Sequence, residues 1–255
     1  MNLRNPDNVI KGGEGFYLEG NKNCAMLIHG GGGGTAADMR ELGNYINKNI
    51  GYSVFAPLLP GFGTNEKELY NIQINDWFNA LDQWFSELKE EFNKIFLIGH
   101  SMGGVFALYL SSKYTKDVNA IVSISAPTKF KGFLIKLIPI VKIFIKYWKV
   151  NDIEEFQKIS NGIWVGYERI PLNLIPKFKK LIKITNSQLN KITAPILIIQ
   201  GKNDQIVPKS SPIKIYNEVS SKIKRIEWLD AKHEILFSDV KMELFKIISD
   251  FIIQY

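Results

Sequence analysis

The sequence is short of the residues from which several kinds of site are built. Its 255 residues include one cysteine, Cys24, and three histidines, His29, His100 and His233. A lone cysteine cannot form an internal disulfide, and because it stands beside the apolar run Ala25–Ile28 we expect a small buried side chain and not a reactive thiol. The sequence offers no cluster of histidines and carboxylates to hold a metal ion, so neither a metal nor another cofactor is predicted.

Long hydrophobic runs are also missing. The first residues, Met1–Asp7, have no apolar core of the kind that a secretory signal needs, and no later segment is an uninterrupted membrane-spanning run. We therefore expect a soluble cytoplasmic protein.

The length suits one large α/β domain as well as two small ones, and we interpret it as one domain with an insertion.

The net charge of +7 is concentrated in one part of the chain. Between Lys129 and Lys183 there are twelve basic and four acidic residues, a local charge of +8 that leaves −1 for all other residues. No basic motif interleaved with stacking aromatics accompanies this charge, so the sequence predicts no nucleic-acid partner.

Six short apolar runs bounded by turn residues recur along the chain. They are rich in Ile and Val and too short for helices, which is typical of buried parallel strands. The runs are Ala25–Ile28, Ser53–Ala56, Ile95–Ile98, Ala120–Ile124, Ile196–Gln200 and Ile226–Leu229. Helical patterns lie between them, and the clearest places apolar side chains on one helix face from Ile74 to Phe92. This alternation predicts an α/β fold, a mostly parallel central sheet flanked by helices.

The alternation stops after the run Ala120–Ile124 and resumes with Ile196–Gln200. An insertion between two strands at the same end of the sheet would lie over the active site as a helical cap, or lid. We therefore expect a core of residues 1–127 and 194–255 and a cap of residues 128–193.

The cap sequence shows helical and irregular patterns and no strand pattern. A helix is predicted from Pro139 to about Val150, with Lys142, Lys146 and Lys149 on one face and apolar side chains over the rest. Three uses of so wide an apolar surface stay open: packing on the core, lining an acyl pocket, or weak contact with a lipid surface rimmed by lysines. The oligomeric state also stays open, because the same surface would serve a dimer.

A nucleophilic serine is predicted at Ser101. A hydroxyl is a poor nucleophile until a base takes its proton and its oxygen is held clear of its own helix. Ser101 is the centre of Gly-His-Ser-Met-Gly (residues 99–103), between the strand Ile95–Ile98 and a helical pattern from Val105, which is the setting of a nucleophile elbow. A glycine turn that only links strand to helix is the structural alternative.

Two backbone N–H groups are needed to bind the oxyanion of an acyl-transfer reaction. Met102 follows the nucleophile at a helix N-terminus and is expected to supply one of them. Gly31 is expected to supply the other, from the loop His29–Gly34, which has a His-Gly-Gly-Gly pattern and follows the strand Ala25–Ile28. A phosphate-binding loop is the alternative, but the lysine and Ser/Thr of a P-loop are missing.

The base and its carboxylate partner follow by elimination. His29 lies in the glycine loop and His100 is expected to point away from the nucleophile, so His233, after the last strand, is the predicted base. Asp204 comes just past a buried strand and gives the order serine, aspartate, histidine, in which the carboxylate orients the imidazole. Asp230 is the nearest rival for this role but is expected to face solvent.

With these features in order, the sequence resembles the α/β-hydrolase superfamily, and more closely its carboxylesterase and monoacylglycerol lipase group. The likeness covers about Cys24–Pro127 and Thr193–Phe251 and includes Asp76-Trp77 and Gly201–Asp204. One departure is Phe62, which stands in Gly-Phe-Gly where relatives often have Gly-His-Gly, a change that bears on the substrate pocket and not on the triad.

The resemblance implies a triad of Ser101, Asp204 and His233 and an oxyanion pair of Gly31 and Met102. It further implies hydrolysis of short- to medium-chain acyl esters or monoacylglycerols, without a cofactor. A thioesterase, an acyltransferase, an aryl or cinnamoyl esterase and a peptidase are rivals that use the same machinery. A non-catalytic hydrolase-fold binding protein is a rival of a different class, although a receptor would need neither the triad nor the glycine loop.

Overall fold

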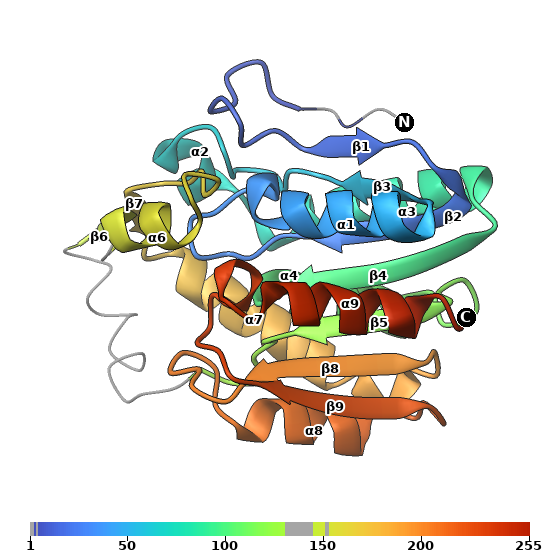
Figure 1. The fold of residues 1–255 in the computed structure, drawn as a ribbon. Helices are drawn as coiled ribbons and strands as arrows, with labels where there is room; N and C mark the ends of the chain where they lie inside the picture. Colours follow the sequence, from blue (N-terminus) through green and yellow to red (C-terminus); the bar gives the residue numbers. More distant parts are fainter. Residues whose placement is uncertain (1–2, 4, 131–144, 151–152) are drawn as a thin grey trace.

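The computed structural model describes residues 3, 5–130, 145–150 and 153–255, apart from the side chains of residues 155 and 156. Its centre is a seven-stranded sheet in the order β1-β3-β2-β4-β5-β8-β9 (Figure 1). Neighbouring strands are parallel except β1, which runs antiparallel to β3. The strands are β1 Phe16–Leu18, β2 Asn21–Ile28, β3 Tyr52–Ala56, β4 Lys94–His100, β5 Ala120–Ile124, β8 Ile196–Gly201 and β9 Lys224–Leu229. The predicted α/β fold is confirmed, and all six predicted strands are present.

The middle strands are apolar on both faces because both faces are covered. In β2, Cys24 and Met26 belong to the core on one side of the sheet, while Ala25 and Leu27 belong to the core on the other. Side chains alternate between the faces along a strand, so a strand buried on both sides lacks the regular alternation of polar and apolar positions. Cys24 is fully buried, as predicted, and burial raises the pKa of its thiol, which keeps it protonated.

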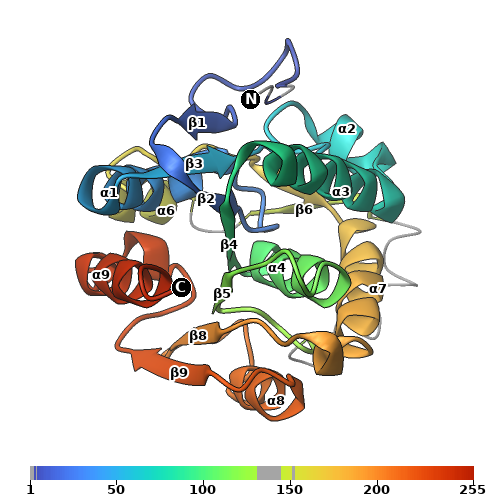
Figure 2. The ribbon, with the colours of Figure 1, turned by 90° about the vertical axis from the view of Figure 1, so that its right-hand side faces the viewer.

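Helices lie on both sides of the sheet. Figure 2 shows α1 and α9 on one side and α3, α4 and α8 on the other. The α-helices are α1 Arg40–Ile50, α2 Glu66–Asn71, α3 Ile74–Glu91, α4 Met102–Lys113, α6 Ile153–Ile159, α7 Leu174–Asn186, α8 Ser210–Glu218 and α9 Lys241–Ile252. Short 3-10 helices are η1 Ala36–Met39, η3 Leu189–Lys191 and η4 Ile235–Phe237. Within the described parts of the chain, no helix has the length and apolar character needed to cross a membrane.

Helix α3 forms where the apolar spacing predicted it. Trp77, Leu81 and Phe85 lie on its buried face and are fully inaccessible to solvent. Burying each such side chain stabilises the fold by about 1.5–3 kcal/mol, which fixes the helix on the sheet. The helix starts where the Gln73 amide donates a hydrogen bond to the Asp76 carboxylate at 2.6 Å, satisfying one N–H that has no partner within the helix.

The segment predicted to form the cap, residues 128–193, contains a strand pair that the sequence did not predict. Strands β6 (Tyr147–Lys149) and β7 (Arg169–Pro171) pair antiparallel in a separate two-stranded sheet. The predicted helix to Val150 is therefore wrong at its end, and residues 139–144 of it lie outside the described residues. The pairing joins segments about twenty residues apart, and such short strands leave no periodic pattern to detect. Figure 1 shows β6, β7 and α6 beyond the carboxyl ends of the parallel strands.

Candidate active site

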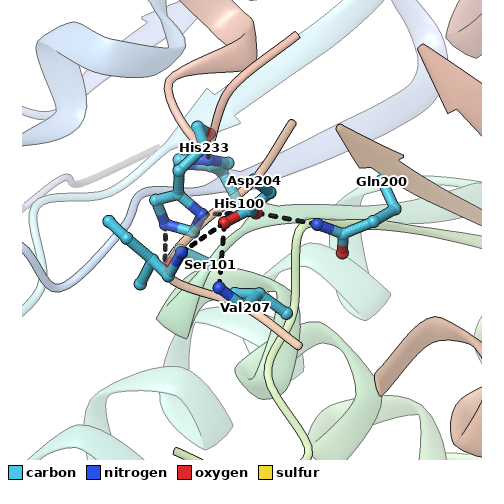
Figure 3. A network of polar contacts seen from close by, with 7 residues as sticks. His100, Ser101, Gln200, Asp204, Val207 and His233 are labelled. Atoms are coloured by element: carbon cyan, nitrogen blue, oxygen red, sulfur yellow. Dashed lines mark hydrogen bonds and ion pairs between the residues drawn. The ribbon is translucent and has the colours of Figure 1, made fainter. Parts of the chain in front are cut away.

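Three predicted site residues stand at the carboxyl edge of the sheet. Ser101 directly follows β4, Asp204 lies in the turn after β8, and His233 lies in the loop after β9 (Figure 3). Because parallel strands end at a common edge, the loops that follow them meet there, and binding sites of such sheets occupy this edge.

Ser101 occupies a strained turn between β4 and α4. Its φ and ψ are 53° and −116°, a conformation that residues with a Cβ rarely adopt and that costs roughly 1–3 kcal/mol. Its amide donates a hydrogen bond to the Ile124 carbonyl at 2.8 Å, which ties the turn to the end of β5. This is the geometry of the predicted elbow, in which the serine oxygen stands clear of the helix that follows.

Ser101, His233 and Asp204 form one hydrogen-bonded chain. The Ser101 Oγ is 3.1 Å from Nε2 of His233, and Nδ1 of His233 is 2.8 Å from Oδ2 of Asp204. A carboxylate only accepts hydrogen bonds, so Nδ1 carries the proton and Nε2 of the neutral ring is free to accept the serine hydroxyl proton. The side chains of His233 and Asp204 are largely buried, which strengthens the electrostatic coupling between them.

Asp204 accepts hydrogen bonds from three groups in addition to His233. Its Oδ1 accepts the amide N–H groups of Ile206 and Val207, each at 2.8 Å, and its Oδ2 accepts Nε2 of Gln200 at 2.7 Å. Burial alone would raise the pKa of this carboxyl, but the hydrogen bond and charge of His233 and the two amides outweigh burial and lower it. Asp204 is therefore anionic at neutral pH. The predicted rival Asp230 is exposed and accepts a hydrogen bond from Asn203 at 2.7 Å.

The other two histidines are neutral, and His29 is fully buried while His100 is partly buried. His100 donates its Nε2 proton to the backbone carbonyl of His233 at 3.0 Å, and burial, followed by repulsion from the His233 ring, lowers its pKa to about 3. His29 accepts the Leu59 amide at Nε2 and donates from Nδ1 to the Gly30 carbonyl, and burial lowers its pKa to about 4. Both hold backbone in place, as a structural role predicts. The hydrogen bond from His100 to the backbone of His233 was not predicted. The position of His100 directly before Ser101 was the one feature of the sequence that could have indicated it.

The glycine loop lies against the start of α4. A Cβ built on Gly31 would stand 2.6 Å from the Met102 sulfur and 3.1 Å from its Cβ, so Gly31 is in direct contact with Met102. The structure thus brings together the two residues predicted to supply the oxyanion donors. Met102 directly follows Ser101 as the first residue of α4, and a Cβ built on Gly30, the residue before Gly31, would stand 3.6 Å from the Cβ of Ser101.

Residues 20–239 match the profile of the family described as serine aminopeptidase, S33. The chain belongs to this family. It is 29% identical over 235 residues to a carboxylesterase of Bacillus subtilis (strain 168), covering 90% of this chain and 91% of that one. It is 28% identical over 231 residues to a thermostable monoacylglycerol lipase of Bacillus sp. (strain H-257), covering 91% and 90%. Among solved structures, a metagenome-derived lipolytic enzyme has a TM-score of 0.87 at 22% identity, covering 97% and 100%.

These relatives confirm the resemblance to the carboxylesterase and monoacylglycerol lipase group of the α/β hydrolases, and this S33-family protein is a hydrolase. Phe62, the departure from the group's pattern, is fully buried. Its ring packs edge-on against His29, with ring centroids 5.2 Å apart and an interplanar angle of 79°, and it also contacts Trp77. From its buried position, Phe62 therefore packs against His29, the first residue of the glycine loop, and supports it.

No group of histidine, cysteine and carboxylate side chains within the described residues is arranged to bind a metal ion. A partly buried carboxyl outside the Ser101 chain of hydrogen bonds belongs to Asp38. Asp38, in η1, lies against Gly34, where a Cβ would stand 3.0 Å from its Cγ, and its Oδ1 is buried with no hydrogen-bond partner among the described residues. Burial raises its pKa to about 8.

We expect the Asp38→Asn variant to gain stability relative to the parent protein as pH rises. The pKa of Asp38 is about 8 when folded and about 4 when unfolded, so between these values the folded state holds a proton that the unfolded chain has lost. Its contribution to stability is therefore complete below pH 4 and is lost as pH rises towards 8, whereas asparagine does not titrate. Thermal unfolding from pH 5 to 8.5 measures this, and a difference in Tm that stays constant with pH would contradict it.

Proposed function

We propose that this protein is a serine carboxylic ester hydrolase acting on short- to medium-chain acyl esters or monoacylglycerols. The observation that carries the proposal is the hydrogen-bonded chain from Ser101 Oγ through His233 to Asp204, beside the contact of Gly31 with Met102. A nucleophile, a base, a carboxylate that orients the base and two candidate oxyanion donors meet at one edge of the sheet. These are the parts that two-step acyl transfer requires.

In the first half-reaction, Nε2 of His233 takes the Ser101 proton as Oγ bonds to the carbonyl carbon of the ester. The carbonyl oxygen becomes an oxyanion, which the amides of Gly31 and Met102 bind, and Asp204 stabilises the imidazolium. The imidazolium then gives its proton to the alcohol oxygen as the bond between that oxygen and the acyl carbon breaks. The alcohol leaves, and the acyl group remains on Ser101.

In the second half-reaction, water takes the place of the alcohol. His233 removes a proton from the water as its oxygen attacks the acyl carbon, and the same two amides bind the second oxyanion. Collapse of this intermediate breaks the bond to Ser101 Oγ, which regains its proton from His233. The carboxylic acid is released and no cofactor takes part.

The proposed substrate class rests on the named relatives, a carboxylesterase and a monoacylglycerol lipase that are each covered over about nine-tenths of their length. We also propose that residues 128–193 form the cap and that residues 1–127 and 194–255 form the core. In this segment Ile145 and Trp148 are 47% and 54% exposed, next to the exposed Lys146 and Lys149. Weak contact with a lipid surface therefore remains part of the proposal.

The test is a fluorophosphonate probe combined with a panel of substrates. We expect the native protein to be labelled on the peptide that contains Ser101, and to hydrolyse p-nitrophenyl esters of short and medium acyl chains or monoacylglycerols. A folded sample that is neither labelled nor active on esters would sink the proposal. Turnover of acyl thioesters alone would make the protein a thioesterase, and turnover of aminoacyl anilides alone would make it a peptidase, the activity in the family's description.

A further inference from the structure

A tyrosine between α6 and β7 reaches the loop that follows β3. Tyr167 is 3% exposed, and its hydroxyl accepts the amide N–H of Thr64 at 2.8 Å and donates to the carbonyl of Gly61 at 2.9 Å. The hydroxyl thus stands between a carbonyl and an amide three residues apart, the pair that a tight turn normally joins directly. The side chain of Thr64 is also 3.3 Å from the same oxygen.

The turn that Tyr167 closes supports the glycine loop. Between its ends lies Phe62, which is fully buried and packs edge-on against His29. His29 in turn donates to the carbonyl of Gly30 at 2.8 Å. A run of direct contacts therefore leads from the Tyr167 hydroxyl to the residue before Gly31.

The backbone on either side of Tyr167 contacts the other end of the same loop. The Tyr167 amide donates to the carbonyl of Gly33 at 3.0 Å, and the Val165 carbonyl accepts the hydroxyl of Thr35 at 2.8 Å. A Cβ on Gly166 would overlap the Gly33 carbonyl oxygen, so the two backbones approach as closely as only glycine permits. The segment Val165–Tyr167 is therefore fastened to both ends of the glycine loop.

This loop needs fastening because of its sequence. Residues 30–34 are five consecutive glycines, which have the greatest backbone freedom of any residue and no side chains with which to hold a shape. Oxyanion stabilisation depends on donors that are in place before the charge develops. A loop of this composition has that property only if other parts of the chain supply the restraint.

We propose that Tyr167 is a positioning residue that, through its hydroxyl and its amide, holds the glycine loop in the conformation in which Gly31 binds the oxyanion. It acts through the turn at Gly61–Thr64 and through Gly33, and does not touch the reacting atoms. This inference rests on the proposed function. It gives the segment Val165–Tyr167, which belongs to the proposed cap, a part in transition-state binding.

The test is the Tyr167→Phe variant, which keeps the ring and removes the hydroxyl. The Gly61 carbonyl and the Thr64 amide lose their partner, and we expect kcat to fall by about tenfold with KM unchanged within about twofold, because only binding of the transition state weakens. A trifluoromethyl ketone forms a tetrahedral adduct on the serine that carries an oxyanion, so its affinity should fall by the same factor as kcat/KM. Thr35→Val removes the bond to Val165 and should move both values in the same direction.

Tyr114→Phe is the matched control, because its hydroxyl donates to Asp82 at 3.0 Å, far along α4 from the glycine loop. It should alter Tm but neither kcat nor the affinity of the ketone. If Tyr167→Phe retains both values, or if only KM changes, the inference is overturned, and if that variant does not fold, Thr35→Val with parent kcat and ketone affinity overturns it. A native protein that neither the fluorophosphonate nor the ketone inhibits contradicts the proposed function itself and not the role of Tyr167.

Discussion

Replacing Ser101 with alanine is expected to lower kcat for ester hydrolysis by about 10⁴-fold or more. The hydroxyl that His233 accepts at 3.1 Å is the attacking atom of the proposed mechanism, and no covalent acyl intermediate forms without it. Fluorophosphonate labelling should vanish in the same variant. Initial rates on a p-nitrophenyl ester, with circular dichroism to show that the fold is intact, measure the effect.

Two further variants separate the chemistry of Ser101 from its conformation. Ser101→Gly should be as inactive as the alanine variant but more stable than it, by about 1 kcal/mol or more, because a φ of 53° is strained with a Cβ and unstrained without one. Ser123→Ala is the control, since Ser123 is a fully buried serine on β5 whose hydroxyl has no hydrogen-bond partner among the described residues. Its activity should match the parent. Substantial activity or labelling in Ser101→Ala would show that another group is the nucleophile.

The strands could be predicted because a strand buried on both faces is a short run of apolar residues, which is visible in the local sequence. The run Ala120–Ile124 was predicted to the residue, since every position in β5 is buried and apolar except one serine. Strand β2 starts earlier than predicted, at Asn21, because its first three residues are polar and incompletely buried but their backbones pair with the neighbouring strands. The spacing of apolar residues indicates which positions are buried. It does not indicate backbone pairing at a strand end whose side chains are exposed.

The residues of the candidate site were selected from the sequence for a different reason, and their catalytic roles stay a prediction. A parallel sheet gathers the ends of its strands at one edge, so any polar residue just after a predicted strand is a candidate without knowledge of the strand order. With three histidines in the chain, elimination left His233. The contacts that hold these residues could not be predicted from the sequence. Gln200, within a buried strand, donates a hydrogen bond to Asp204, and His100 donates one to the backbone carbonyl of His233.

The structure of the proposed cap, residues 128–193, was predicted least well because it depends on distant partners. Its strands β6 and β7 pair with each other, and the hydroxyl of the buried Tyr167 bonds to the distant turn at Gly61–Thr64. A tyrosine in an irregular segment carries no local sign of such a partner. Long-range pairing of this kind follows from the folded topology and not from composition or spacing.

Replacing Gly103 with alanine is expected to destabilise the fold by about 4 kcal/mol or more. A Cβ on Gly103 would stand 2.6 Å from the carbonyl oxygen of His29 and closer still to that of Ile28. Both neighbours are backbone atoms at the end of β2, so relief requires α4 to move away from the sheet. Because small domains are stable by only about 5–15 kcal/mol, we expect low soluble yield and a midpoint of urea unfolding far below that of the parent.

Gly32→Ala is the matched control, because a Cβ there has no atom within 4 Å, and its stability should equal that of the parent. A Gly103→Ala variant as stable as this control would show that α4 and β2 tolerate separation. The same close approach that forbids a side chain at Gly103 brings Met102 into contact with Gly31. In any folded fraction of Gly103→Ala, kcat should therefore fall by a larger factor than KM rises. The reason is that moving α4 outward separates the two proposed oxyanion donors before it disturbs the hydrogen bond between Ser101 and His233.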